Sequence, residues 1–131
     1  MWVLDTNTLI YFFKGEGMVA ESLLRKAPAD IGIPAIVLYE LEVGIAKSSS
    51  PEKRTNQLAE LTSVVQVLPF HQQEAKAAAD IRATLEKQGT SIGPYDTLIA
   101  GTALAHGAIL VSRNTREFAR IDTLRLEDWY R

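Results

Sequence analysis

The feature that most limits the possible folds is an apolar run near the start of the sequence that stops abruptly at a carboxylate. Trp2, Val3 and Leu4 show no alternation of apolar and polar residues, and Asp5 follows them directly. A run of this kind is typical of a strand buried on both faces, as in parallel sheets covered by helices. Ligands of such sheets bind beyond the carboxyl ends of the strands. Asp5 is therefore a candidate site residue, and its structural alternative is an Asx turn or an N-cap for the next helix.

Predicted helices and strands alternate along the rest of the chain. The patterns predict strands over residues 30–33, 64–68, 108–111 and 123–126, and helices over residues 8–13, 16–27, 34–47, 51–62, 71–88, 94–106 and 114–119. Such an alternation implies right-handed crossovers and a parallel sheet with helices on both faces. We expect one α/β domain over residues 1–131, with three α/β/α layers around a central, mostly parallel sheet of four or five strands.

Composition and charge exclude several classes of protein. The sequence has no cysteine, which removes disulfides and thiol nucleophiles and fits a reducing compartment. The longest uncharged stretch, 97–112, is shorter than the roughly 20 apolar residues of a membrane helix, and no basic segment precedes Asp5 as in a secretory signal. We therefore expect a cytoplasmic protein without a membrane span. The net charge of −2 argues against binding nucleic acid by bulk electrostatics alone, so any such binding is local or metal-assisted.

A second acid, Asp96, falls in the first turn of the predicted helix 94–106. A carboxylate is favoured there by the helix dipole alone, which is the structural alternative. The residues three, four and seven positions later are Ile99, Ala100 and Ala103, so Asp96 lies on the apolar face of the helix and faces the core side. A charge in such a place needs a partner.

The predicted helix 34–47 supplies a third acid, but periodicity leaves its identity open. Glu40 has apolar neighbours at helical spacing on both sides, and Glu42 has a similar neighbourhood. Either residue lies on an apolar face of the helix, so periodicity does not choose between Glu40 and Glu42.

A polar cluster follows the predicted strand 108–111, with the order Ser112, Arg113, Asn114, Thr115, Arg116 and Glu117. The structural alternative for Asn114 and Glu117 is a capping box. Several carboxylates gathered without lysines between them repel one another, and a hard divalent cation relieves that repulsion. Such a site suits metal-assisted phosphoryl transfer. His71 and His106, at the two ends of predicted helices, are expected to be structural.

Four sequence motifs together resemble those of PIN-domain ribonucleases, and most closely the VapC toxins of VapBC toxin–antitoxin modules. The motifs are Leu4-Asp5-Thr6-Asn7, then Tyr39-Glu40-Leu41 with Gly44, then Gly93-Pro94-Tyr95-Asp96 with Ile99-Ala100, and finally Val111 to Phe118. The resemblance covers nearly the whole chain. It implies a single PIN-like domain, a homodimer, and a magnesium-dependent endoribonuclease in which manganese also works. It further implies an RNA substrate, with initiator tRNA cut in the anticodon stem-loop, and a VapB-type antitoxin that covers the active site.

The resemblance also assigns roles to residues. It implies catalytic Asp5, Glu40, Asp96 and Glu117, with the first three as metal ligands, and so selects Glu40 over Glu42. Many relatives carry an aspartate where this chain has Asn114, and Glu117 is implied to hold a metal-bound water. Supporting polar residues are Thr6, Asn7, Ser112 and Asn114. Arg113 and Arg116 lie beside the expected site in an otherwise slightly acidic protein, so we predict that they hold RNA phosphate.

Three other classes compete with this interpretation. A haloacid-dehalogenase-like phosphohydrolase needs a second aspartate two residues after the first, where this chain has Asn7. A response-regulator receiver needs its phosphoacceptor after the third strand, where the sequence gives Pro69 and Phe70. A non-catalytic PIN-like module that binds RNA or a partner would have no reason to keep clustered carboxylates.

Overall fold

A five-stranded, entirely parallel sheet forms the centre of the molecule. The computed structural model describes residues 1–131, and the strand order is β3-β2-β1-β4-β5. The strands are β1 (Trp2–Leu4), β2 (Ile31–Pro34), β3 (Gln66–Leu68), β4 (Ile109–Val111) and β5 (Arg125–Glu127). The expectation of a mostly parallel sheet of four or five strands is confirmed, with five strands and no antiparallel pair.

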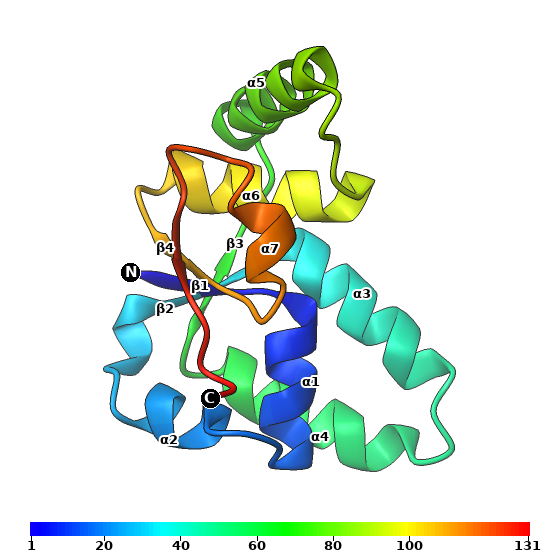
Figure 1. The fold of residues 1–131 in the computed structure, drawn as a ribbon. Helices are drawn as coiled ribbons and strands as arrows, with labels where there is room; N and C mark the ends of the chain where they lie inside the picture. Colours follow the sequence, from blue (N-terminus) through cyan, green and yellow to red (C-terminus); the bar gives the residue numbers. More distant parts are fainter.

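Helices cover both faces of this sheet. They are α1 (Thr6–Lys14), α2 (Val19–Leu24), α3 (Ala35–Ala46), α4 (Pro51–Thr62), α5 (Gln72–Gln88), α6 (Pro94–Ala105) and the short α7 (Thr115–Phe118), with a 3₁₀ turn, η1 (Pro28–Asp30), before β2. Figure 1 shows α5 and α6 above the sheet and α1, α2 and α4 below it, which is the expected α/β/α layering. None of these helices combines the length and the apolar composition needed to cross a bilayer.

The pairing of β1 with β4 brings distant polar residues together. Val3 and Leu4 are fully buried, as expected for a strand covered on both faces. Leu4 pairs with Val111 in parallel register, and the Asp5 amide donates to the Val111 carbonyl at 3.1 Å. Asp5 and Ser112, which directly follow these two residues, therefore lie side by side at the carboxyl ends of β1 and β4.

Two expectations about secondary structure are wrong in detail. The helix expected over residues 16–27 is only α2, because Gly15 and Gly17 both adopt left-handed backbone with φ of 70° and 64°. Pro34 was expected to open a helix, but it ends β2 and pairs with Leu68 before α3 begins.

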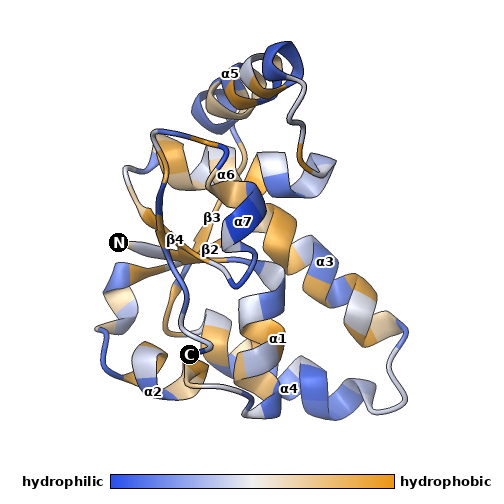
Figure 2. Ribbon diagram, viewed as in Figure 1, coloured by the Kyte–Doolittle hydropathy of each residue, from blue (hydrophilic) through white to orange (hydrophobic).

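Apolar side chains fill the space between the layers. Figure 2 shows hydrophobic residues concentrated in the central strands and the inner helices, whereas α7 is strongly hydrophilic. Helices α5 and α6 pack unusually closely, because a Cβ atom added at Gly101 would lie 2.6 Å from the Cβ atom of Ala78. The sheet and its covering helices thus form a rigid support for the residues at the strand ends.

Candidate active site

Asp5 is buried at the junction of β1 and α1, with a different partner on each carboxylate oxygen. Its Oδ1 accepts a hydrogen bond of 2.9 Å from the Thr8 amide, which makes Asp5 the N-cap of α1. Its Oδ2 accepts a bond of 2.5 Å from the Ser112 hydroxyl at the end of β4. Asp5 is therefore both the expected helix cap and a carboxylate at the edge where the site was predicted.

The surroundings of Asp5 disfavour its charged form. Only 5% of the residue is exposed, and this burial raises the pKa of the Asp5 carboxyl, although the bonds from Ser112 and Thr8 oppose the change. The negative charge of Asp128 acts in the same direction as burial. Asp128 was missed at the sequence level. Applying the strand-end rule to the last strand as well as the first would have identified it.

Glu40, and not Glu42, belongs to the site. The Thr6 hydroxyl on α1 donates a hydrogen bond of 2.7 Å to Glu40 Oε1 on α3. Glu40 is half-buried, whereas Glu42 is exposed. The crossing of α1 and α3 thus decides the choice that helical periodicity left open, and it agrees with the residue that the family resemblance selects.

Asp96 lies in the first turn of α6, where the charges of other acids raise its pKa. It is half-buried, and its pKa is raised to about 6 by burial and by the charges of Asp5, Glu117 and Glu40, in that order. The three ion pairs of the molecule involve other acids, namely Asp80, Glu86 and Glu74. A carboxylate that merely complemented the helix dipole would have a lowered pKa, so the charge cluster dominates at Asp96.

Ser112, Asn114 and Glu117 form a chain of hydrogen bonds after β4. The Ser112 hydroxyl oxygen accepts from the Asn114 amide at 2.9 Å, and Asn114 Nδ2 donates to Glu117 Oε2 at 2.9 Å. The capping box considered for Asn114 and Glu117 is wrong, because the two side chains bond to each other and neither caps the helix backbone. Asn7, expected in the polar shell, is exposed and makes no hydrogen bond through its side chain.

The two arginines of this loop differ in their surroundings. The guanidinium carbon of Arg113 lies 3.7 Å from the ring centroid of Tyr130 and 5.7 Å from that of Tyr11. Arg116 is exposed and makes no such contact. Neither arginine is paired with a carboxylate of the protein. Both guanidinium groups are therefore free to meet an external anion, and Arg113 alone has a fixed support.

The donor set fits a small hard cation that keeps part of its water shell. All the side-chain acceptors gathered here are oxygens, from carboxylates, hydroxyls and one amide, which suits magnesium or manganese and not a soft metal. No three acidic or histidine side chains lie close enough to bind one ion directly. Magnesium is commonly held by one or two carboxylates, with water and substrate phosphate completing its shell. The uncompensated charge around Asp96 is what such a cation would neutralise.

The histidines belong to a separate structural contact. Buried Glu74 accepts a bond of 2.6 Å from the His71 amide and lies 3.3 Å from His106 Nε2, which joins the start of α5 to the end of α6. The His71 amide bond is the main reason that the pKa of Glu74 is lowered. The structural role expected for both histidines is confirmed.

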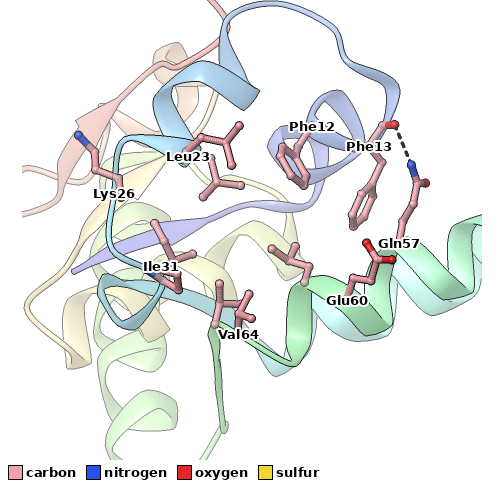
Figure 3. Close-up of a pocket in the computed structure, with 12 residues that line it drawn as sticks. Phe12, Phe13, Leu23, Lys26, Ile31, Gln57, Glu60 and Val64 are labelled. Atoms are coloured by element: carbon pink, nitrogen blue, oxygen red, sulfur yellow. Dashed lines mark hydrogen bonds between the residues drawn. The ribbon is translucent and has the colours of Figure 1, made fainter.

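An apolar hollow lies on the lower side of the molecule, between α1, α2 and α4. Figure 3 shows its lining, with the side chains of Phe12 and Phe13 on one side and Leu23 and Ile31 on the other. Its volume is about 460 Å³, and Leu24 on its rim is 77% exposed. The catalytic candidates do not line it, so this hollow is a second exposed feature of the surface.

Comparisons with known proteins give consistent matches over nearly the whole chain. The family described as the PIN domain matches residues 2–124. The chain is 38% identical over 128 residues to a tRNA(fMet)-specific endonuclease VapC of Salmonella typhimurium, covering 98% of this chain and 97% of that protein. It is 35% identical over 128 residues, with the same coverage, to a ribonuclease VapC2 of Haemophilus influenzae. A crystal structure of VapBC2 from Rickettsia felis bound to a promoter DNA fragment superposes with a TM-score of 0.90 at 35% identity, covering 98% of each chain.

Proposed function

The chain belongs to the PIN-domain family, and from this premise we propose that it is an endoribonuclease toxin of the VapC type that cuts RNA at the cluster of Asp5, Glu40, Asp96 and Glu117. The observation that carries this proposal is the charge at Asp96, whose pKa is raised to about 6 by burial and by three other carboxylates without a balancing base. Membership of the PIN-domain family excludes the alternative of a haloacid-dehalogenase-like phosphohydrolase.

We assign Asp5 and Asp96 as direct ligands of a magnesium ion and Glu40 as an acid that reaches the ion through water, since three acids do not lie close enough to bind it directly. Bound there, magnesium or manganese would supply an activated water and neutralise charge on the leaving oxygen. Ser112 and the Thr8 amide fix the two oxygens of Asp5, and Thr6 orients Glu40. Asn114 holds one oxygen of Glu117, which leaves the other free to accept a proton from water.

The proposed substrate is a tRNA, and initiator tRNA in particular. The Salmonella relative is a tRNA(fMet)-specific endonuclease, and it matches this chain over nearly its whole length. The protein carries a net charge of −2, so general attraction to RNA is weak and contacts near the site have to provide recognition. Arg113 and Arg116, both free of acidic partners, are the proposed contacts with RNA phosphate.

The proposed partner is a VapB-type antitoxin. The similar structures include VapBC complexes from Rickettsia felis and Salmonella typhimurium. An antitoxin that covers the strand-end acids would keep RNA away from them. A homodimer and a cytoplasmic location, both expected from the sequence, stay predictions.

The test is cleavage of purified tRNA by the isolated protein. Initiator and elongator tRNAs are incubated separately with the protein in magnesium, in manganese and in chelator, and the products are separated on a denaturing gel. We expect cleavage of initiator tRNA with either metal and at least about a hundredfold loss of rate in chelator, because the metal provides the activated water.

Two controls distinguish this activity from contamination. Asp96→Asn protein, prepared in parallel, should cut no RNA in any buffer, and Glu42→Gln, which changes a nearby exposed acid, should cut at the wild-type rate. Full cleavage in exhaustive chelator would overturn the metal assignment. Equal cleavage by the Asp96→Asn protein would overturn the assignment of the site.

A further inference from the structure

Arg113 rests on two aromatic rings that come from opposite ends of the sequence. Its guanidinium carbon lies 3.7 Å from the centroid of Tyr130, which follows β5, and 5.7 Å from that of Tyr11 on α1. The two rings meet edge to face, with centroids 4.9 Å apart and an interplanar angle of 69°. This arrangement is a cation–π contact backed by an aromatic pair, and each component is favourable by itself.

The backbone around Tyr130 is fixed on both sides. The Met18 amide donates to the Tyr130 carbonyl at 2.9 Å, and the Tyr130 amide donates to Asp128 Oδ1 at 2.9 Å. Gly17 makes this approach possible, because a Cβ atom there would lie 2.6 Å from the Tyr130 carbonyl oxygen, and its φ of 64° is one that glycine adopts without strain. The ring beneath Arg113 is therefore held in place by contacts that do not involve Arg113.

The side chains of Tyr11 and Tyr130 interact with the Arg113 guanidinium and raise its pKa, but no carboxylate occupies the rest of its hydrogen-bonding edge. A guanidinium that lies against a ring face keeps its N–H donors in its own plane, pointing away from the ring. Arg113 is exposed and has no carboxylate partner. Its sequence neighbours on either side, Ser112 and Asn114, are bonded to Asp5 and Glu117. An exposed, supported cation without an acidic partner therefore lies between two residues that are each hydrogen-bonded to a member of the acid cluster.

The position of the rings indicates which phosphate this cation reaches. The Cα atom of Tyr11, six residues after Asp5, lies roughly 9 Å along the helix axis from that of Asp5. The charges that shift the pKa values of Asp5 and Asp96 do not include that of Arg113, so its guanidinium does not contact either acid. It is placed to meet a backbone phosphate beside the cleaved bond and not the reacting phosphate itself.

We propose that Tyr130 and Tyr11 are positioning residues that hold Arg113 ready to bind an RNA phosphate adjacent to the cleavage site. The inference rests on the proposed function and adds a physical role for the end of the chain. A supported guanidinium loses less side-chain freedom when it binds than a free one does. Arg116, which has the same charge and no aromatic support, should therefore contribute less to binding.

The experiment measures RNA binding in the cleavage-deficient Asp96→Asn protein by fluorescence anisotropy with labelled initiator tRNA over a series of salt concentrations. Tyr130→Leu removes the ring, and Tyr130→Phe keeps it. We expect Tyr130→Leu to weaken binding about threefold to tenfold and Tyr130→Phe to stay within about twofold. Arg113→Ala should reduce the slope of log affinity against log salt by about one.

The decisive readout is the coupling between ring and arginine. Tyr130→Leu should have no further effect once Arg113 is alanine, but its full effect should persist in the Arg116→Ala protein. In the active protein, Tyr130→Leu should raise KM with kcat nearly unchanged. An effect of Tyr130→Leu that is equally large with and without Arg113 would overturn the inference, as would equal damage by the Phe and Leu variants.

A second variant protects the test from a folding defect. If Tyr130→Leu unfolds below the assay temperature, Tyr11→Leu removes the other ring and should show the same coupling to Arg113 at a smaller magnitude. Absence of that coupling would also overturn the inference. Wild-type cleavage in magnesium separates the two claims. Cleavage without ring–arginine coupling removes this inference alone, and failure of the protein to cut or bind RNA removes the proposed function with it.

Discussion

At the scale of single residues, the fold changes the ionisation of Asp96, which lies among other acids. Burial and the charges of Asp5, Glu117 and Glu40 raise its pKa to about 6. The folded protein therefore binds a proton at Asp96 that the unfolded chain, with an ordinary aspartate, has already lost near pH 5. This difference favours the folded state fully below the unfolded pKa and is lost as the pH rises through about 6.

The first prediction follows from that sign. In chelator, the wild-type protein should melt at a higher temperature at pH 5 than at pH 7, and Asp96→Asn should reduce this difference, because the variant has no proton to lose at that position. At pH 7 the variant should melt at the same temperature as the wild type or higher, because repulsion is relieved. Scanning calorimetry of both proteins at matched ionic strength measures these differences.

Catalysis should show the opposite dependence on pH. A protonated Asp96 cannot hold a cation, so the rate of tRNA cleavage at subsaturating magnesium should fall as the pH drops below about 6, the pKa of Asp96 in the metal-free protein. Added manganese should raise the melting temperature of the wild type and not that of Asp96→Asn. A variant that melts lower than the wild type in chelator and still cuts RNA would show that Asp96 is only a helix-terminal charge.

Most of the acids of the site could be predicted from the sequence, but the side-chain contacts around the site could not. Asp5, Asp96 and Glu117 each follow a strand or open a helix, and these are positions that a linear pattern records. Tyr130 contacts Arg113 and Tyr11 only because β5 returns beside β4, so the contact depends on the tertiary fold. Glu40 required either the family resemblance or the crossing of α1 and α3, since Glu42 has the same periodicity.

At the scale of secondary-structure elements, glycines set the spacing between helices. Gly101 on α6 faces Ala78 on α5 so closely that an added Cβ atom would lie 2.7 Å from the Ala78 backbone nitrogen. Gly44 on α3 has ordinary helical backbone, and an added Cβ atom would have no neighbour within 4 Å. The same substitution should therefore have opposite effects at the two positions.

The second prediction compares these two glycines. Gly101→Ala should lower the free energy of unfolding by about 1–3 kcal/mol, because α5 and α6 must separate to admit the methyl group. Gly44→Ala should raise it by roughly 0.5–1 kcal/mol, because alanine loses less backbone entropy in a helix. Urea denaturation monitored by circular dichroism gives both values. Equal effects of the two changes would mean that the α5–α6 contact is looser than described.

The order and type of the elements could be predicted because most of them carry a clear apolar period or a proline or glycine at an end. The helix expected over residues 16–27 was predicted too long, because apolar residues keep helical spacing beyond the points where the helix begins and ends. The start of the helix depends on left-handed backbone at Gly15 and Gly17, and the second of these is required by the approach of Tyr130. Local periodicity carries no information about such a long-range contact.

At the scale of the whole molecule, the acid cluster and the apolar hollow are separate surfaces. The hollow between α1, α2 and α4 is lined mainly by apolar side chains, including Phe12, Leu23 and Leu61. An apolar groove of this kind is suited to the apolar face of a partner helix. For a VapC-type toxin the expected partner is its antitoxin. A helix of the antitoxin seated in the hollow leaves another antitoxin segment to cover the acids, so antitoxin binding and catalysis should be separable by mutation.

The third prediction tests this separation. Leu24→Glu places a charge on the rim of the hollow at a residue that is 77% exposed, so it should leave stability nearly unchanged. We expect it to weaken inhibition by the cognate VapB-type antitoxin at least tenfold while tRNA cleavage by the free toxin stays at the wild-type rate. Ala83→Glu adds the same charge on an exposed position of α5 and serves as the matched control. Unchanged inhibition of Leu24→Glu would place the antitoxin elsewhere.

The parallel order of the sheet also determines when the protein can act during its own synthesis. Asp5 is among the first residues made, but the hydroxyl that holds it belongs to Ser112, and Glu117 follows later still. At about 5–20 residues per second, a ribosome needs on the order of ten seconds to make the intervening chain. Until β4 has left the ribosome and paired with β1, the carboxylates cannot come together at the carboxyl ends of these strands. A nascent chain of this toxin therefore has no assembled acid cluster with which to cut RNA, and an antitoxin has until nearly the end of synthesis to be present.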